Sequence, residues 1–395
     1  MYFFPTTLTP EQHRFNMNSR QLKQGRIGEI NPKIILVVAS ILAIALCIWG
    51  SNGVRGTDQY WYLSDTETLI KDQKPLSNIT FPGTVIRNDR SGVKDNYIIH
   101  NGPLIHIHAI VGKHTGAYNS WILLNIALHI FIGLSIYLCT ATLTSTRTAS
   151  CVSALYLVSP IGLWQTVNLL QEQFFAGLMA AIALTWLHKD KNSRALEFLL
   201  AGLLAFGVLC HPIFFALALI YFAFRLIQSI RIYKNIQSTF LWIGIACLFF
   251  LLKQQTEIWF PSNFQPDLNA IITGSIPDKS NMIWHFSDLD TGVTVELLKS
   301  KVVAFFYHHF LHPAQLPFYL YTNLAMFLLI FTVYKTRLEH IRFLIPAILV
   351  FGLYVAITVL MQTQARYQQI IASIVFITIG PVSYTHLTLP TIYSV

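Results

Sequence analysis

The feature that most constrains this chain is a series of nearly charge-free apolar runs, each close to the length that crosses a lipid bilayer. The first of these runs contains no charged residue. A helix needs about 20 apolar residues to cross the hydrocarbon core. The runs cover about residues 34–49, 118–139, 149–166, 169–187, 196–210, 213–227, 239–252, 316–334, 343–361 and 367–380. We therefore expect an all-α integral membrane protein with about ten transmembrane helices, in the range of about 9–11.

Composition excludes a soluble chain of the same length. Of the 395 residues, 54% are hydrophobic and 11% are charged, and the mean hydropathy is +0.52. Soluble domains carry roughly 25% charged residues, which is what covers a surface that faces water. The net charge of +9 is explained by membrane topology, so we expect no nucleic-acid partner.

The basic residues predict the orientation of the chain. With residues 1–33 in the cytoplasm, the tail and the inner connectors, which include Arg147 and Lys335, hold 15 basic and 5 acidic residues, against 12 and 13 on the outer side, as the positive-inside rule requires. Two long segments, at about 51–117 and 253–314, then face outward and hold most of the acidic residues. We expect a protein of a bacterial inner membrane whose N-terminus is cytoplasmic and whose two long segments lie on the outer face.

The C-terminal residues differ in character from the rest of the chain. Residues 381–395 are polar and resemble a foreign tail that recurs at the ends of truncated reading frames. We therefore predict three parts: a basic cytoplasmic tail at 1–33, a transmembrane domain at 34–380, and a non-native tail at 381–395. A genuine polar C-terminus is the alternative.

Three charged residues fall at the predicted outer ends of apolar runs. Asp58 lies about eight residues beyond the first run, among aromatic residues, where a carboxylate can act as a general base. Glu172 stands inside the apolar pattern between two runs, and such a charge usually faces protein or a water-filled cavity. Arg366 opens the last run, and a guanidinium can bind a phosphate through two hydrogen bonds. The alternatives are loop acids at the interface and an arginine that snorkels beside Tyr367.

The order and spacing of several short motifs resemble one membrane-enzyme family. Asp58 lies in an early outer loop, and Tyr97 to Leu104 ends that loop with a Pro-Leu pair. Ser159-Pro160 precedes Glu172, and Arg366-Tyr367 opens a late run. In this order they resemble the GT-C glycosyltransferases, including the protein-mannosyltransferase-like and lipid A aminoarabinose-transferase-like branches. In one further segment of the resemblance, His211 stands where arginine is usual.

The resemblance implies both a fold and a reaction. It implies a GT-C-like enzyme that takes a sugar from a polyprenyl-phosphate donor, inverts the anomeric carbon, and passes the sugar to a glycan, lipid or protein acceptor. Asp58 is then the catalytic base. The residues expected to bind the donor and its phosphate are Arg366, Tyr367, Glu172 and His211. The residues expected in the substrate loop are Tyr60, Tyr62 and His100.

We expect no metal ion and no cofactor. The alternatives are a divalent cation at Asp65 and Glu67, whose spacing suits carboxylate ligands, and zinc at His308 and His312, which share a face if they are helical.

Other functions remain open from the sequence. A polysaccharide polymerase of the cell envelope uses related chemistry on an outer loop. A transporter or lipid flippase is a different class, and it is expected to show broken spans and ionisable groups near the midplane. The spans here are nearly charge-free, and the polar residues gather in two outer loops, which favours surface chemistry. A structural membrane protein is the remaining alternative.

Overall fold

The structure, a computed structural model, is built from α-helices throughout the part of the chain that it describes. It describes residues 31–51, 53, 57–72, 102–188, 194–210, 212–228 and 368–388, with short pieces between 230 and 355. The prediction of an all-α chain is confirmed for these residues, which contain no strand. The helices are α1 (Pro32–Gly50), α2 (Thr57–Asp72), α4 (Gly102–Thr115), α5 (Ala117–Leu143), α6 (Thr146–Leu157), α7 (Pro160–Val167), α8 (Glu172–His188), α9 (Arg194–Cys210), α10 (Pro212–Gln228) and α16 (Gln368–Thr388).

Six helices, α1, α5, α8, α9, α10 and α16, match predicted apolar runs to within about a turn at most of their ends, whereas the third run does not form one helix. The run at 149–166 was expected to be one span, but it forms α6 and α7, which are bent by 46°. Ser159 ends the first piece and caps the second, because its hydroxyl accepts a hydrogen bond from the Gly162 amide. Pro160 follows at the first helical position, where its missing N–H costs nothing. These two residues explain the bend.

Within the described residues, two helices are long and apolar enough to cross a membrane. They are α1 and α5, and the bent α6–α7 pair counts as a third if it is one span. Shorter apolar stretches lie in α9, α10 and α16. The predicted runs at 239–252, 316–334 and 343–361 fall largely outside the described residues, so the number of about ten spans stays a prediction.

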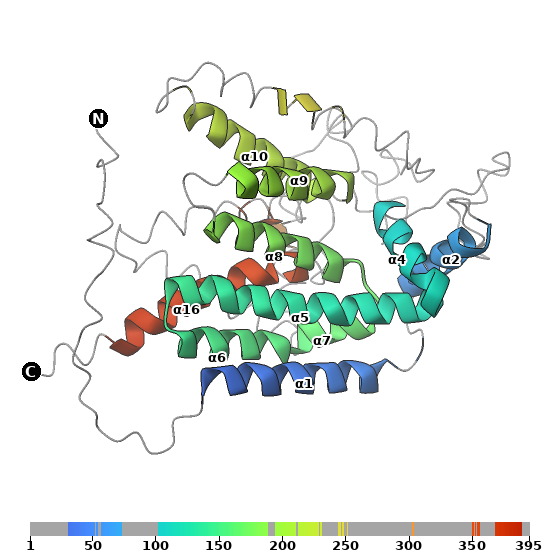
Figure 1. Cartoon of the computed structure of the whole chain (residues 1–395), viewed down its shortest axis with the longest axis horizontal. Helices are drawn as coiled ribbons and strands as arrows, with labels where there is room; N and C mark the ends of the chain where they lie inside the picture. Colours follow the sequence, from blue (N-terminus) through green and yellow to red (C-terminus); the bar gives the residue numbers. More distant parts are fainter. Residues whose placement is uncertain are drawn as a thin grey trace, which may run out of the picture.

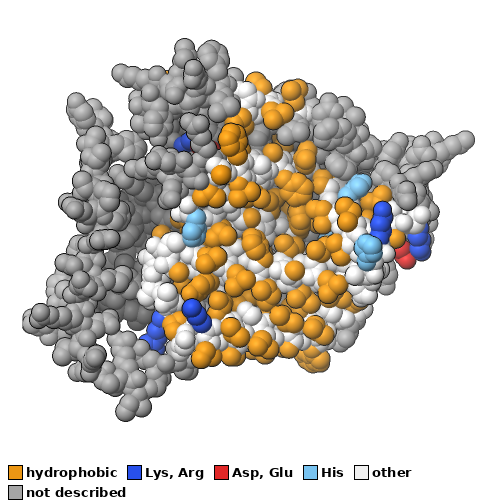
Figure 2. Space-filling view, in the orientation of Figure 1, with side chains coloured by type: hydrophobic (Ala, Val, Ile, Leu, Met, Phe, Trp, Pro, Cys, Tyr) orange, Lys and Arg blue, Asp and Glu red, His pale blue; other side chains and the backbone are white. Residues whose placement is uncertain are grey.

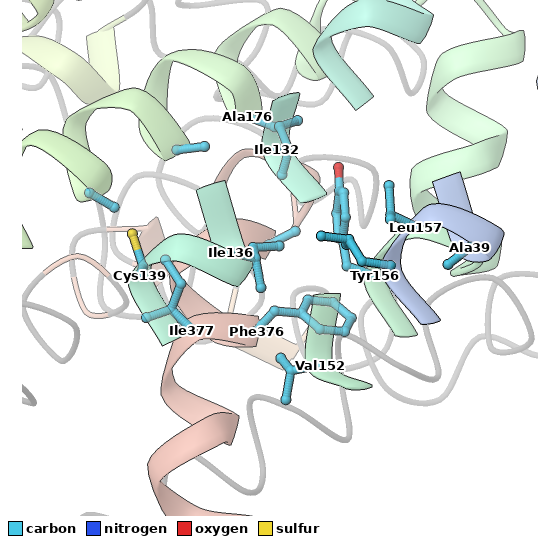
Figure 3. Close-up of a cluster of buried hydrophobic side chains, with 14 of the residues drawn as sticks. Ala39, Ile132, Ile136, Cys139, Val152, Tyr156, Leu157, Ala176, Phe376 and Ile377 are labelled. Carbon is cyan, nitrogen blue, oxygen red and sulfur yellow. The ribbon is translucent and has the colours of Figure 1, made fainter. Parts of the chain in front are cut away.

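The helices pack side by side into a bundle (Figure 1). α5 packs against α4, α6, α8 and α16. α16 also packs against α6 and α8, and α9 lies between α8 and α10. A core cluster from α1, α5, α6, α8 and α16 lies between them, with Tyr156, Phe376 and Ile136 at its centre (Figure 3). This apolar packing fixes the relative positions of helices that lie far apart in the sequence.

The outer surface of the bundle is apolar. Figure 2 shows hydrophobic side chains across the face in view, with basic and histidine side chains towards its two ends. On α1, the large side chains Val37, Val38, Ile41, Ile48 and Trp49 are exposed. A soluble monomer rarely exposes so large an apolar area. The apolar helices and this surface are those of a membrane protein.

Two helices of the predicted first loop lie together at one end of the bundle, here called the α2–α4 end (Figure 1). There the Tyr118 hydroxyl at the start of α5 donates to the Ser51 carbonyl at 3.0 Å and accepts from the Gly53 amide at 3.0 Å. The end of α1 and the start of α5 therefore also lie at the α2–α4 end. The sequence analysis treated this region as a loop and did not predict its helices.

The last helix crosses a predicted boundary. Residues 381–395 were set apart as a non-native tail, but α16 continues through Gly380 to Thr388. The foreign origin of the tail stays a prediction.

Candidate active site

The first turn of α2 contains Asp58 and is held against the turn between α7 and α8. Gln59, the next residue, is buried. Its amide nitrogen donates to the Asn168 backbone carbonyl and also lies 3.2 Å from the Asn168 side-chain oxygen. The side chains of Asp58 and Tyr60 lie outside the described residues. The backbone next to Asp58 is thus fixed, because Gln59 is bonded to Asn168. Asn168 stands four residues before Glu172 in the sequence.

An aromatic stack holds α2 and α4 on the start of α5. The rings of Tyr62 and Trp121 are 5.1 Å apart, and those of His108 and Trp121 are 3.6 Å apart and nearly parallel. The Trp121 indole N–H donates to the Thr66 hydroxyl at 3.0 Å, and that hydroxyl donates to the Tyr62 carbonyl at 2.7 Å. Tyr62, expected in the substrate loop, is therefore buried in the packing beneath it.

Burial also lowers the pKa of His108. It lies outside the predicted spans and is fully buried, and this burial lowers the pKa of its imidazole from 6.5 to about 3. The ring is therefore neutral at pH 7, which suits a side chain stacked on an indole.

Asp65 and Glu67 lie in different surroundings. Asp65 is fully buried, whereas Glu67 is exposed and forms an ion pair with Lys71 at 3.1 Å. Two residues apart on a helix, the two carboxylates point about 200° apart. The structure does not bring this pair together. Across the described residues, no group of three His, Cys, Asp or Glu side chains could hold a metal ion.

The first turn of α8 places Glu172 inside the protein. Its side chain is fully buried, as expected for an acid at membrane depth that faces protein. The preceding turn contains Leu169, which has a φ of 52°. That backbone conformation is costly for a side chain other than glycine. Leu169 is held there because it and Leu170 are buried in the cluster formed by α2, α4 and α5.

Next to Glu172, a buried polar network joins α8 to α16 and α6. The Gln369 amide nitrogen donates to the Gln173 side-chain oxygen at 2.9 Å and to the Tyr156 hydroxyl at 2.9 Å. All three side chains are fully buried. The start of α16 is therefore fixed beside the start of α8. Gln369 is three residues after Arg366 in the sequence, and Arg366 itself lies outside the described residues.

Together these contacts link three distant segments in series. They are the first turn of α2 after Asp58, the turn that leads into Glu172, and the first turn of α16 after Arg366. The candidates that lie outside the described residues are Arg366, Tyr367, His211, His100, His308 and His312. Sequence reasoning missed Gln59, Gln173 and Gln369. The available signal was that each is a polar residue within one turn of a predicted site residue.

No protein-family model and no curated protein sequence matches this chain. Solved structures of an archaeal oligosaccharyltransferase from Archaeoglobus fulgidus are similar in fold. The enzyme tethered with an acceptor peptide gives a TM-score of 0.52 at 15% identity over 91% of this chain and 50% of that one. The same organism's AglB, in complex with an inhibitory peptide and a dolichol-phosphate, gives 0.51 at 16% identity over 91% and 51%.

These likenesses show that the chain shares the fold of these membrane enzymes. The chain spans about half the length of the oligosaccharyltransferases that it matches.

Proposed function

We propose that this chain is a membrane glycosyltransferase that moves a sugar from a polyprenyl-phosphate-linked donor to an acceptor at the outer face of the membrane. The observation that supports the proposal is a pair of buried contacts in an oligosaccharyltransferase-like fold, Gln59 with Asn168 and Gln173 with Gln369, whose residues stand close in sequence to Asp58, Glu172 and Arg366. Related solved structures contain dolichol-phosphate or an acceptor peptide, which are the two kinds of ligand that such a reaction needs.

Asp58 is the proposed base. The lipid phosphate departs already ionised, so the acceptor hydroxyl or amine needs a proton acceptor more than the leaving group needs an acid. In-line attack by the acceptor inverts the anomeric carbon, while the carboxylate of Asp58 takes the acceptor's proton. The hydrogen bond between Gln59 and Asn168 supports this role, because it fixes the turn from which Asp58 projects.

Arg366 and Tyr367 are proposed to bind the donor phosphate, with Glu172 and His211 lining the same region. A guanidinium binds phosphate oxygens through two parallel hydrogen bonds and stays charged at a membrane interface. Glu172 is buried, and its carboxylate is proposed to orient such a cation. Tyr60 and His100 belong to the proposed substrate loop, and Tyr62 supports that loop from below.

The positive-inside pattern supports an outer-face site in a bacterial inner membrane. The exposed Arg147 lies in the first turn of α6, which begins at the opposite end of the bundle from α2 and α4 (Figure 1). With that end in the cytoplasm, the α2–α4 end faces outward, where a donor with an apolar tail and a polar head meets a water-soluble acceptor.

The test uses the purified full chain in lipid nanodiscs, with polyprenyl-phosphate donors that carry a labelled sugar. We expect saturable binding of the donor and transfer of the label to at least one acceptor class, namely a peptide, a lipid or a glycan. Growth of a glycan chain would identify the polymerase alternative. Movement of an unmodified lipid-linked donor between leaflets without sugar transfer would contradict the proposal in favour of a flippase, and absence of donor binding would refute both.

A further inference from the structure

The bend between α6 and α7 interrupts the backbone hydrogen bonds that a continuous helix would make. Pro160 has no N–H to donate to the carbonyl four residues back. The Leu157 carbonyl would accept from an amide beyond the bend in a continuous helix, and here it accepts from the ring N–H of His129 at 2.9 Å. The Gly162 amide is bonded to the Ser159 hydroxyl at 3.3 Å. Two side chains thus serve backbone groups on either side of the bend.

His129 contacts both helices of the bent pair from a third helix, α5. Its ring is buried and bonded to Leu157, which Figure 3 shows beside Tyr156 at the end of α6. The ring also lies against α7, because a Cβ at Gly162 would be 2.6 Å from its Cε1 atom. A carbonyl without a partner is costly inside an apolar bundle. The end of α6 therefore depends on a donor that α5 supplies.

The far end of α7 is attached to α2. Asn168 caps α7, and its side-chain amide donates to the Trp164 carbonyl of that helix at 2.7 Å. Its backbone carbonyl accepts from the side-chain amide of Gln59 in the first turn of α2. The eight residues of α7 span about 12 Å, so a change of about 10° in the bend moves Asn168 by about 2 Å. A displacement of that size breaks a hydrogen bond.

We infer that His129 and Ser159 brace the α6–α7 bend, and that the brace sets where the Asn168 carbonyl meets the first turn of α2. His129 is thereby a positioning residue, which acts on α2 through α7. The first turn of α2 contains Asp58, the proposed base, so the effect on catalysis rests on the proposed function. The effect on the docking of α2 is independent of it.

The test compares His129→Leu with His129→Gln in lipid nanodiscs. Leucine offers no N–H to the Leu157 carbonyl, whereas the amide nitrogen of glutamine can reach the place of the ring Nε2. We expect His129→Leu to raise hydrogen exchange about 5–100-fold at residues 61–64, whose amides bond to the carbonyls of the first turn of α2. We also expect kcat for sugar transfer to fall by up to about 100-fold. His129→Gln should retain parental exchange and kcat.

Two further variants separate the brace from general loss of stability. Ser153→Ala removes another buried bond between α6 and α5, from the Ser153 hydroxyl to the Gly133 carbonyl at 2.6 Å, and should leave exchange at 61–64 and kcat unchanged. Ser159→Ala removes the other part of the brace, leaves α5 unaltered, and should raise the same exchange even if His129→Leu does not fold. Exchange in α4, which the Trp121 stack holds on α5, should stay parental in all variants.

A folded His129→Leu chain with parental exchange at 61–64 overturns the brace. An equal rise of exchange in α2 and α4 also overturns it, and so does a His129→Gln chain as defective as His129→Leu. A rise confined to α2, in a chain whose parent transfers no sugar, supports the brace and refutes only the proposed function.

Discussion

At the scale of single residues, neighbouring side chains decide which substitutions the bundle tolerates. His129 is buried in α5, and its ring N–H donates to the Leu157 carbonyl at 2.9 Å. Gly162 in α7 makes room for that ring, because a Cβ at this position would lie 2.6 Å from the His129 Cε1 atom. Gly202 in α9 has no atom within 4 Å of the corresponding point.

We therefore expect Gly162→Ala to destabilise the chain and Gly202→Ala to stabilise it. The first change overpacks a filled site, which costs about 1–3 kcal/mol. The second removes backbone freedom from a helix without a clash and contributes about 0.5–1 kcal/mol. Thermal unfolding of both variants in one detergent measures the difference. A Gly162→Ala chain as stable as the parent would show that His129 is not held as described.

Residue-level prediction from the sequence worked where position alone carried the information. Glu172 was singled out because an acid interrupts an apolar pattern, and it is indeed buried. Gln59, Gln173 and Gln369 were not predicted, because their importance depends on partners more than 100 residues away. Asp65 was considered as a partner of Glu67, whereas the helical register of α2 separates the two.

At the scale of helices, the first predicted loop is an ordered part of the structure. α2 and α4 dock on α5 through Trp121, which stacks on both Tyr62 and His108. The sequence did not reveal these helices, because they lie in a long segment rich in Asp, Asn and Gly and their stability comes from packing. The α6–α7 bend was missed for the opposite reason, since apolar composition continues across Ser159 and Pro160.

The docking of α4 should weaken in acid. The pKa of His108 is lowered to about 3 in the folded chain, against about 6.5 in an unfolded one. Stability from the neutral ring is therefore complete above about pH 6.5 and is lost as the pH falls towards 3, by up to about 1.4 kcal/mol per pH unit. Hydrogen exchange of residues 102–115 at pH 7 and pH 5 measures this loss.

His108→Phe separates this effect from general acid damage. A phenyl ring preserves the stack on Trp121 but takes up no proton, so exchange in α4 should become insensitive to pH. His114→Asn, at an exposed position of the same helix, should retain the parental pH dependence. If His108→Phe also retains it, another group causes the loss.

At the scale of the whole molecule, the fold consists of helices packed side by side and of an end formed by α2 and α4 (Figure 1). The bundle contains the apolar surface and the buried clusters, while α2 and α4 lie at one end with the candidate site (Figure 1). The fold class could be predicted from hydropathy because the bilayer permits few alternatives. The assembly of the site could not, because it depends on how α2, α8 and α16 pack.

Orientation is tested by labelling single cysteines in a chain whose native cysteines have been replaced. Lys113 on α4 and Arg147 after α5 are both exposed, and they lie at opposite ends of the bundle. We expect an impermeant thiol reagent added to intact cells to label Lys113→Cys and not Arg147→Cys. The reverse pattern would place the candidate site in the cytoplasm and contradict the proposed topology.

The central claim is that Asp58 is the base in sugar transfer at the α2–α4 end. Asp58→Asn preserves the shape of the side chain and removes its proton acceptor. We predict that kcat for transfer from a polyprenyl-phosphate donor falls about 10²–10⁴-fold, while donor affinity and folding stay at parental values. Glu67→Gln, at the exposed partner of Lys71, is the matched acid-to-amide control and should retain parental kcat. Transfer by Asp58→Asn at close to the parental rate would contradict the account.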